Sequence, residues 1–334
     1  MAHIENMQMK YSNNIKLVIV SPCFNEEQLL KQSSDILNGV LEDLITKNKI
    51  SNDSFILYVN DGSLDDSWNV IKSINSVNSR VCGINLSRNV GHQYAIMAGM
   101  MKARSSADAV ITIDADLQDD TQAIERMIDE YLNGAEVVYG IKTDRKIDSW
   151  MKRLAASIFY KFQQQLGVKS IKNHADFRLM SRKALDILSG FHERNLYVRG
   201  IIPLLGCKTA TVDDCLSQRI DGESKYTTCK QIRLAIDGIT SFSIKPLEFI
   251  FGIGAVMLVV AIMMVVYVMI SLLFGNAIAG WASIMISLWF IGAVLTMSFG
   301  LIGIYIGKIY IEVKGRPIYS IDESIGLANN NLPS

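Results

Sequence analysis

Residues 109–120, A-V-I-T-I-D-A-D-L-Q-D-D, begin with apolar and β-branched side chains and end with acidic ones. The first half is typical of a strand that is buried on both faces of a parallel sheet. Asp114 and Asp116 follow it, and residues two apart in extended backbone point to the same side. Such carboxylates repel each other unless a hard cation such as Mg²⁺ or Mn²⁺ binds them. The pattern indicates a cation site, although acidic residues also favour the start of a helix through its dipole.

Polar residues follow three other strands that the sequence predicts. Apolar runs typical of strands occupy residues 17–21, 55–59, 81–86 and 137–140. Helical patterns lie between the first two of these strands, ending near residue 46, and over residues 91–103 and 121–133. This alternation predicts crossover units and a parallel sheet, whose ligands bind outside the carboxyl ends of the strands. Four strands have polar endings, which read P-x-F-N-E from Pro22, N-D-G-S from Asn60, S-R-N from Ser87 and D-A-D from Asp114. Together they predict a binding site at one edge of the sheet.

The composition argues against a nucleic-acid-binding protein, a disulfide-rich protein and a zinc-binding protein. Lysine and arginine together number 33, as do aspartate and glutamate, so the net charge is zero and no nucleic-acid partner is expected. The 5 cysteines show no C-x-x-C spacing. They therefore indicate neither a disulfide framework nor a zinc site, and free thiols fit a reducing cytoplasm.

The C-terminal third predicts membrane insertion. Residues 249–307 contain no Asp, Glu, Lys or Arg, and the apolar stretches 249–274 and 278–307 each exceed the roughly 20 residues that a bilayer span needs. A buried pair of core helices is the alternative, but soluble helices of that length rarely lack a polar face. Lys245 precedes the first stretch and Lys308 follows the second. The positive-inside rule then puts both chain ends in the cytoplasm, so we expect a multi-pass plasma-membrane protein with a cytoplasmic catalytic domain.

The motifs together resemble a known family. P-x-F-N-E, V-N-D-G-S-x-D-D-S, R-N-x-G-x-Q-x-A-x-x-x-G from Arg88 and D-A-D-L-Q are similar to those of family-2 glycosyltransferases. More narrowly, they resemble the polyprenyl-phosphate glycosyltransferases, which include the bactoprenol glucosyltransferases and dolichol-phosphate mannose synthases. The similarity continues through D-F-R-L-M-S-R from Asp176, R-x-x-G-E-S-K-Y from Arg219 and E-x-K-G-R-P-x-Y from Glu312, so it covers nearly the whole chain.

The resemblance implies an α/β fold of glycosyltransferase-A type, Rossmann-like with a mostly parallel sheet, followed by a two-helix transmembrane hairpin. We expect a nucleotide-sugar-binding domain over residues 1–170 and an acceptor and juxtamembrane region over residues 171–245. Two transmembrane helices over residues 246–310 and a cytoplasmic tail over residues 311–334 would follow. Residues 150–166 and 226–242 suit helices at the lipid interface, and equally ordinary helices that face a core.

The resemblance also implies roles for individual residues. The nucleotide sugar would be bound by Pro22, Phe24, Glu26, Val59, Asp61, Asp114, Ala115 and Lys142. A divalent Mg²⁺ or Mn²⁺ would be held by Asp114, Asp116 and Gln118. The catalytic set would be Asp116, Asp176, Arg219 and Lys225. The family carries G-x-R after the fifth strand, whereas this chain has Gly140-Ile-Lys142 with Arg145 nearby, which leaves open the residue that binds the acceptor phosphate.

The activity that the resemblance implies is metal-dependent transfer of one sugar, with inversion, onto undecaprenyl phosphate at the cytoplasmic membrane face. UDP-glucose is the favoured donor, and donors of N-acetylglucosamine, mannose or an amino-arabinose derivative remain alternatives. A processive polysaccharide synthase would carry Q-x-x-R-W, which this chain lacks. A catalytically inert, membrane-anchored sugar-nucleotide-binding protein is a further alternative. The partners would be a nucleotide sugar, a polyprenyl phosphate and the membrane, and homo-oligomerisation stays open.

Overall fold

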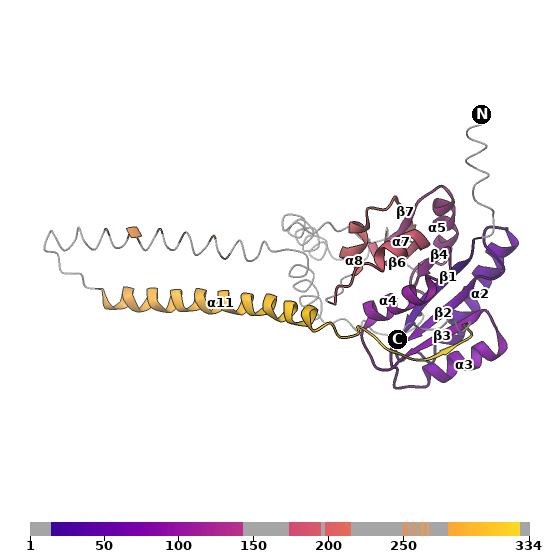
Figure 1. Ribbon diagram of the computed structural model, residues 1–334, viewed down its shortest axis with the longest axis horizontal. Helices are drawn as coiled ribbons and strands as arrows, with labels where there is room; N and C mark the ends of the chain where they lie inside the picture. Colours follow the sequence, from indigo (N-terminus) through magenta and orange to yellow (C-terminus); the bar gives the residue numbers. More distant parts are fainter. Residues whose placement is uncertain are drawn as a thin grey trace, which may run out of the picture. The chain divides into compact units, whose positions relative to one another are not determined.

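The computed structural model describes residues 15–142, 174–194, 198–214 and 280–327, together with isolated positions between residues 250 and 266 (Figure 1). The chain divides into two compact units. One contains a single eight-stranded sheet, and the other contains the long helix α11 (Trp281–Lys314).

The sheet has the strand order β7-β5-β6-β4-β1-β2-β3-β8. β1 pairs in parallel with β2 and β4, and β2 pairs in parallel with β3. The five strands expected from sequence are all present and form the parallel part of an α/β fold. The bounds are β1 (Leu17–Cys23), β2 (Phe55–Asn60), β3 (Val81–Leu86), β4 (Ala109–Thr112), β5 (Val137–Lys142), β6 (His174–Ser181), β7 (Thr209–Asp214) and β8 (Ile321–Ile325).

Strand β6 separates β4 from β5. It pairs antiparallel with both of them, and β5 pairs in parallel with β7 on its other side. The sequence did not predict β6, because Asp176 and Arg178 put charges into an otherwise apolar segment. Both side chains are buried and joined by an ion pair of 2.6 Å, so each compensates the charge of the other.

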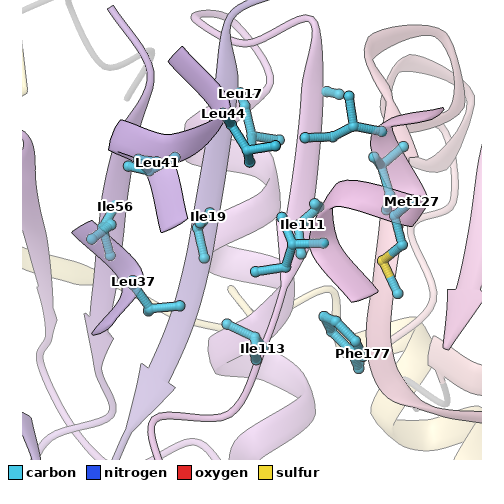
Figure 2. Close-up of a cluster of buried hydrophobic side chains, with 14 of the residues drawn as sticks. Leu17, Ile19, Leu37, Leu41, Leu44, Ile56, Ile111, Ile113, Met127 and Phe177 are labelled. Atoms are coloured by element: carbon cyan, nitrogen blue, oxygen red, sulfur yellow. The ribbon is translucent and has the colours of Figure 1, made fainter. Parts of the chain in front are cut away.

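Helices cover both faces of the sheet. The helices of this unit are α2 (Leu30–Thr46), α3 (Ser67–Val77), α4 (His92–Ala103), α5 (Ala123–Leu132), α7 (Arg182–Leu188), the short α8 (Val198–Ile201) and a 3₁₀ turn, η1 (Ile202–Leu205). On one face, α2 and α5 pack on alternate residues of the strands. Figure 2 shows Leu37 and Leu41 of α2 beside Ile19 and Ile56, and Met127 of α5 above Phe177.

On the opposite face, α4 packs closely on β1 and β2. A side chain at Gly99 would begin 2.3 Å from a methyl of Val20 and 2.7 Å from a methyl of Val59, well inside van der Waals contact. Gly99 therefore lets α4 approach the sheet. This approach brings His92, the first residue of α4, to the carboxyl ends of the strands.

The segment that follows α11 supplies β8, the strand at one edge of the sheet. β8 pairs antiparallel with β3, and Ser87 N–H donates to the carbonyl of Ser320 at 3.0 Å. Glu323 accepts a hydrogen bond from the indole of Trp68 at 2.7 Å and forms an ion pair with Lys72 at 3.0 Å. The segment 317–327, expected from sequence to be a simple tail, thereby belongs to the unit that contains the sheet.

Among the described residues, one helix is long and apolar enough to cross a membrane. Residues Phe290–Lys314 of α11 have a mean hydropathy of 1.9, and none of the apolar window is buried within the structure. At about 1.5 Å per residue this stretch exceeds the roughly 30 Å hydrocarbon core of a bilayer. The first expected span, residues 249–274, and the expected interfacial helices, residues 150–166 and 226–242, lie wholly or mostly outside the described residues.

Candidate active site

The loops that follow β1 and β2 are joined by hydrogen bonds between side chains and backbone. Asn25 has a left-handed backbone, with φ of 54°, and its side-chain oxygen accepts from Leu64 N–H at 2.9 Å. Its own N–H donates to Ser63 Oγ at 3.0 Å, and Glu26 N–H donates to Ser67 Oγ at 3.0 Å. The P-x-F-N-E and N-D-G-S motifs thus fix each other, and Phe24 remains 38% exposed at their rim.

Asp61 connects the β2 loop to the residues before α4. Its buried carboxylate accepts from Val90 N–H at 2.8 Å and from Gly91 N–H at 2.9 Å. Burial raises the pKa of Asp61, although these two hydrogen bonds oppose the rise. A carboxylate has about four acceptor positions, so contact with a nucleotide stays open to it.

Gly62 is required by the same loop. It has a φ of +61°, and an added Cβ would lie 2.5 Å from both Arg88 C and Asn89 N. Only a residue without a side chain fits this close backbone approach. The approach frames a cavity of about 550 Å³ whose lining includes Phe24, Gly62, Ser63, Arg88, Asn89 and, from the β8 segment, Asp322.

The D-x-D segment forms a tight turn directly after β4. Leu117 has a φ of 48° and donates from its N–H to the carbonyl of Asp114 at 3.1 Å. Ala115 and Leu117 are buried, whereas Asp114 and Asp116 are partly exposed. The amide of Gln118 donates to Asp116 Oδ2. The turn therefore holds Asp114, Asp116 and Gln118 within five consecutive residues, and their role as metal ligands stays a prediction.

The electrostatics of this turn suit a cation. Burial raises the pKa of Asp114; His92 opposes the rise, and the neighbouring carboxylates of Asp176 and Asp116 add to it. Among the described residues, no three His, Cys, Asp or Glu side chains form a metal-binding group. Mg²⁺ in particular is commonly held by one or two carboxylates, with substrate phosphates and water as its other ligands. The two carboxylates of the D-x-D turn are compatible with such an ion.

Lys142 is paired with a residue that the sequence motifs did not identify. At the end of β5 its ammonium lies 3.1 Å from the buried carboxylate of Asp119. Burial raises the pKa of Asp119, Lys142 opposes this, and the charges of Asp114 and Asp214 add to it. Asp214, at the end of β7, is buried and accepts from Asp120 N–H at 2.8 Å. Asp119 and Asp120 thus connect the D-x-D turn to β5 and β7.

Asp176 lies at the centre of a charged cluster on β6. Its carboxylate accepts from Arg178 at 2.6 Å and from Nε and Nη2 of Arg199 at 3.2 and 2.9 Å. Burial alone would raise its pKa, but a hydrogen bond from His92 and the charges of Arg199 and Arg178 hold the pKa of Asp176 well below the usual range. Asp176 is therefore ionised at neutral pH and is poorly suited to accept a proton.

His92 lies between this cluster and the D-x-D turn. Its Nε2 lies 3.4 Å from Asp176 Oδ2 and 3.5 Å from Asp114 Oδ1. Burial lowers the pKa of His92, but Asp176 and Asp114 outweigh it and raise the pKa overall. The imidazole of His92 thus lies between the carboxylates of Asp114 and Asp176.

The predicted site residues lie at one edge of the sheet. Pro22 and Val59 belong to β1 and β2, Lys142 is the last residue of β5, and Asp176 lies on β6. The other described ones follow the ends of β1, β2 and β4. Arg219 and Lys225 lie outside the described residues. Sequence analysis missed His92, Arg199, Asp119 and Asp214. The only available signals were the position of His92 within R-N-x-G-x-Q and the third acidic residue of the D-x-D segment.

Comparisons with known proteins agree with this geometry. Residues 18–188 match the model of glycosyl transferase family 2. Uncharacterized glycosyltransferase YkoT of Bacillus subtilis (strain 168) is 44% identical, covering 97% of this chain and 95% of the relative. The SfII prophage-derived bactoprenol glucosyl transferase of Shigella flexneri is 35% identical, covering 93% of this chain and 98% of the relative.

Among solved structures, glucosyl-3-phosphoglycerate synthase from Mycobacterium tuberculosis, in complex with Mn²⁺ and UDP-glucose, is similar with a TM-score of 0.42 and 14% identity. That similarity covers 72% of this chain and 80% of the synthase, and it is too weak to bear on function. The family match and the two sequence relatives, by contrast, extend over the strands and loops described above. The chain belongs to glycosyl transferase family 2 and has an α/β fold of glycosyltransferase-A type.

Proposed function

We propose that this protein transfers a single glucose from UDP-glucose onto undecaprenyl phosphate, with inversion at the anomeric carbon. The observation that carries the proposal is the 35% identity, over 93% of the chain, to a protein named bactoprenol glucosyl transferase. The similarity includes the apolar helix α11 as well as the sheet, which fits an acceptor that resides in a bilayer. The product would be a lipid-linked sugar for later use in the cell envelope.

The arrangement of the sheet edge supports this chemistry. The cavity beside Phe24 and Arg88 would take the base, Asp61 and Glu26 would contact the nucleoside, and the D-x-D turn would receive the diphosphate. Asp114, Asp116 and Gln118 would hold a divalent cation, which supplies positive charge to the departing diphosphate. Lys225 and Arg219 would add positive charge to the same leaving group.

The reaction needs little help from a general base. A phosphate oxygen of the lipid forms a bond to C1 of glucose, while the bond from C1 to the nucleoside diphosphate breaks and its electron pair leaves with UDP. Near pH 7 a phosphate monoester is already largely dianionic, since its second pKa is about 6. No proton has to move, which agrees with the low pKa of Asp176.

The membrane arrangement is part of the proposal. We propose a helical hairpin with both chain ends in the cytoplasm, supported by α11 and by the apolar residues 249–274 before it. A cysteine introduced at Asn276 should then react with an impermeant reagent added outside the cell. Labelling of a cysteine at Asn331 from outside would show the reverse orientation.

The full-length protein, purified in detergent, provides the test of the activity. Undecaprenyl phosphate is incubated with Mn²⁺ and, in turn, labelled UDP-glucose, UDP-N-acetylglucosamine, GDP-mannose or a UDP-linked amino-arabinose. We expect labelled lipid with UDP-glucose and none with the Asp116→Asn variant. Labelled lipid with another donor would show that the sugar of that donor, and not glucose, is transferred. No labelled lipid with any donor would favour an inert sugar-nucleotide-binding protein.

A further inference from the structure

The cavity of about 550 Å³ beside Phe24, called the donor cavity from here on, has one wall from the segment that follows α11. Its other lining residues lie between Phe24 and Asn89, whereas Asp322 belongs to β8, more than 200 positions further along the chain. Among the described residues, Asp322 is the one carboxylate in this lining and Arg88 is the one cation. The C-terminal segment therefore supplies the negative charge of the donor cavity.

Strand β8 is fixed beside this cavity by contacts on both sides of Asp322. β8, yellow in Figure 1, pairs antiparallel with β3. Before Asp322, the carbonyl of Ser320 accepts from Ser87 N–H at 3.0 Å. After it, Glu323 accepts from the indole of Trp68 at 2.7 Å, and Trp68 itself lines the donor cavity. The carboxylate of Asp322 thus has a defined place at the cavity wall.

A β-bulge distinguishes Asp322 from its neighbours on β8. Glu323 is in register with Asn85, and Ile321 is in register with Leu86. Asp322 is therefore an extra residue that has no counterpart on β3. A bulge bends its strand and redirects a side chain, and bulges are frequent beside active sites. Asp322 is also exposed, so a ligand in the cavity can reach its carboxylate.

Asp61, the other carboxylate at this end of the sheet, is used differently. It is buried, and its two oxygens accept from the N–H groups of Val90 and Gly91. It is not part of the lining of the donor cavity. Asp61 thus fixes the loop that frames the cavity, whereas Asp322 is the carboxylate that the cavity presents to a ligand.

The side chains of the donor cavity match the hydrogen-bonding edge of uracil. That edge presents one N–H, at N3, between two carbonyl oxygens. A carboxylate only accepts hydrogen bonds and a guanidinium only donates them, so Asp322 suits the N–H and Arg88 suits a carbonyl. Phe24, 38% exposed at the rim, offers a ring on which a base can stack. Cytosine carries no hydrogen at N3, so a carboxylate in this position would select against it.

We propose that Asp322 is a donor-binding residue that accepts a hydrogen bond from N3–H of uracil, and that β8 brings it to the donor cavity. The inference rests on the proposed function, because it assigns the base subsite of the same donor. Selection of a uridine nucleotide then depends on a segment outside residues 18–188, the part of the chain that matches the family model.

The test is calorimetric titration of the full-length protein in detergent with UDP and Mn²⁺. The affinity for CDP, the weaker ligand, is measured by its displacement with UDP. Asp322→Ala removes the carboxylate, and Asp322→Asn keeps the size of the side chain but can donate from its amide to N3 of cytosine. Asp53→Ala is the matched control, since Asp53 is also exposed but precedes β2, at the opposite end of the strand from the cavity.

A second measurement separates loss of the carboxylate from displacement of the strand. Cys82 on β3 is 3% exposed, and its thiol donates to the carbonyl of Gly326 at 3.2 Å. Maleimide labelling of Cys82, resolved by peptide mass spectrometry, therefore reports release of β8. Gly326→Ala is the positive control, because its Cβ would lie 2.6 Å from Asn75 Nδ2 and 2.9 Å from Cys82 Sγ. The Asp322 variants should leave Cys82 as protected as in the wild-type protein.

We expect UDP to bind about tenfold more weakly to Asp322→Ala, the scale for losing a hydrogen bond to a charged group, while CDP affinity stays within about twofold. The preference of Asp322→Asn for UDP over CDP should also fall. Where the alanine variant exposes Cys82, the asparagine variant decides. Unchanged UDP binding would overturn the assignment, as would an equal loss for both nucleotides with Cys82 still protected.

The outcome for Asp322 is independent of the outcome for sugar transfer. A preference for UDP that depends on Asp322, in a protein that transfers no glucose, would uphold the base contact and defeat the proposed function. Glucose transfer by Asp322→Ala with the wild-type KM for UDP-glucose would uphold the proposed function and overturn the base contact.

Discussion

The two sides of the D-x-D turn are built from different interactions. At the ends of β1–β3, neutral side chains and one carboxylate bind backbone N–H groups, as Asn25 does with Leu64 and Asp61 does with Val90. At β6 the contacts are ion pairs, in which Asp176 is shared by two arginines. The first arrangement fixes loop positions through backbone groups, whereas the second holds several charged side chains close together.

This difference indicates which substrate each side suits. A base and ribose are recognised by shape and hydrogen bonds, for which rigid loops around a cavity are appropriate. A phosphate is recognised by charge, for which a fixed guanidinium is appropriate. The D-x-D turn lies between the two and is the proposed metal site, so changes there should have the largest effect.

The largest effect is expected for Asp116→Asn. The change removes one of the two carboxylates at the turn, and we expect transfer to fall by about 10³-fold or more because charge on the leaving diphosphate loses its counter-charge. Product formation from labelled donor measures it, with circular dichroism to establish that the protein is folded. Asp129→Asn, at an exposed carboxylate that pairs with Lys49, is the control and should be fully active. Undiminished activity of Asp116→Asn, or of the wild-type protein in metal-free buffer, would contradict the metal site.

A smaller effect is expected for Lys225→Ala. Lys225 lies outside the described residues, and its role is predicted from the G-E-S-K motif alone. Loss of one preorganised charge that acts mainly in the transition state should lower kcat by roughly 10²–10³-fold, with a smaller change in donor affinity. Steady-state kinetics with varied donor separates these two quantities. Wild-type turnover would mean that the loop is only a surface turn.

The smallest effect is expected for Gly62→Ala, which tests the donor side alone. Its new Cβ would meet the backbone of Arg88 and Asn89 at 2.5 Å and force the two loops apart. We expect a loss of about 1–3 kcal/mol in the free energy of unfolding, the cost of overpacking, and weaker binding of UDP. Binding of the polyprenyl phosphate acceptor should be unaffected. Gly39→Ala, in α2 with no atom within 4 Å of the new methyl, should leave UDP binding intact.

The parallel half of the sheet could be predicted because its strands carry plain physical signals. Residues 17–21, 55–59 and 109–113 are apolar and end in polar motifs, and the structure has β1, β2 and β4 there. β6 could not be predicted, since the charges of Asp176 and Arg178 become compatible with burial only when they are paired. β8 could not be predicted either, because its pairing with β3 joins residues more than 200 positions apart.

The candidate site was predictable to the same extent. The motif residues lie at the edge where parallel strands end, as the topology of the sheet requires. Arg199 and His92 belong to the site through tertiary contacts with Asp176 and Asp114. The position of His92 within R-N-x-G-x-Q is the one local signal, and Arg199 has none, since each contact is defined by a partner on another element.

The central claim is that glucose is transferred in a single in-line displacement at C1, and the configuration of the product tests it most directly. UDP-glucose carries an α-linked sugar, and a single in-line displacement inverts that centre. Proton NMR of the purified glycolipid, made by the wild-type protein from UDP-glucose and undecaprenyl phosphate, reports the anomeric configuration. We expect the β-linked product. An α-linked product would mean that the sugar is transferred with retention, and the single in-line displacement would be wrong.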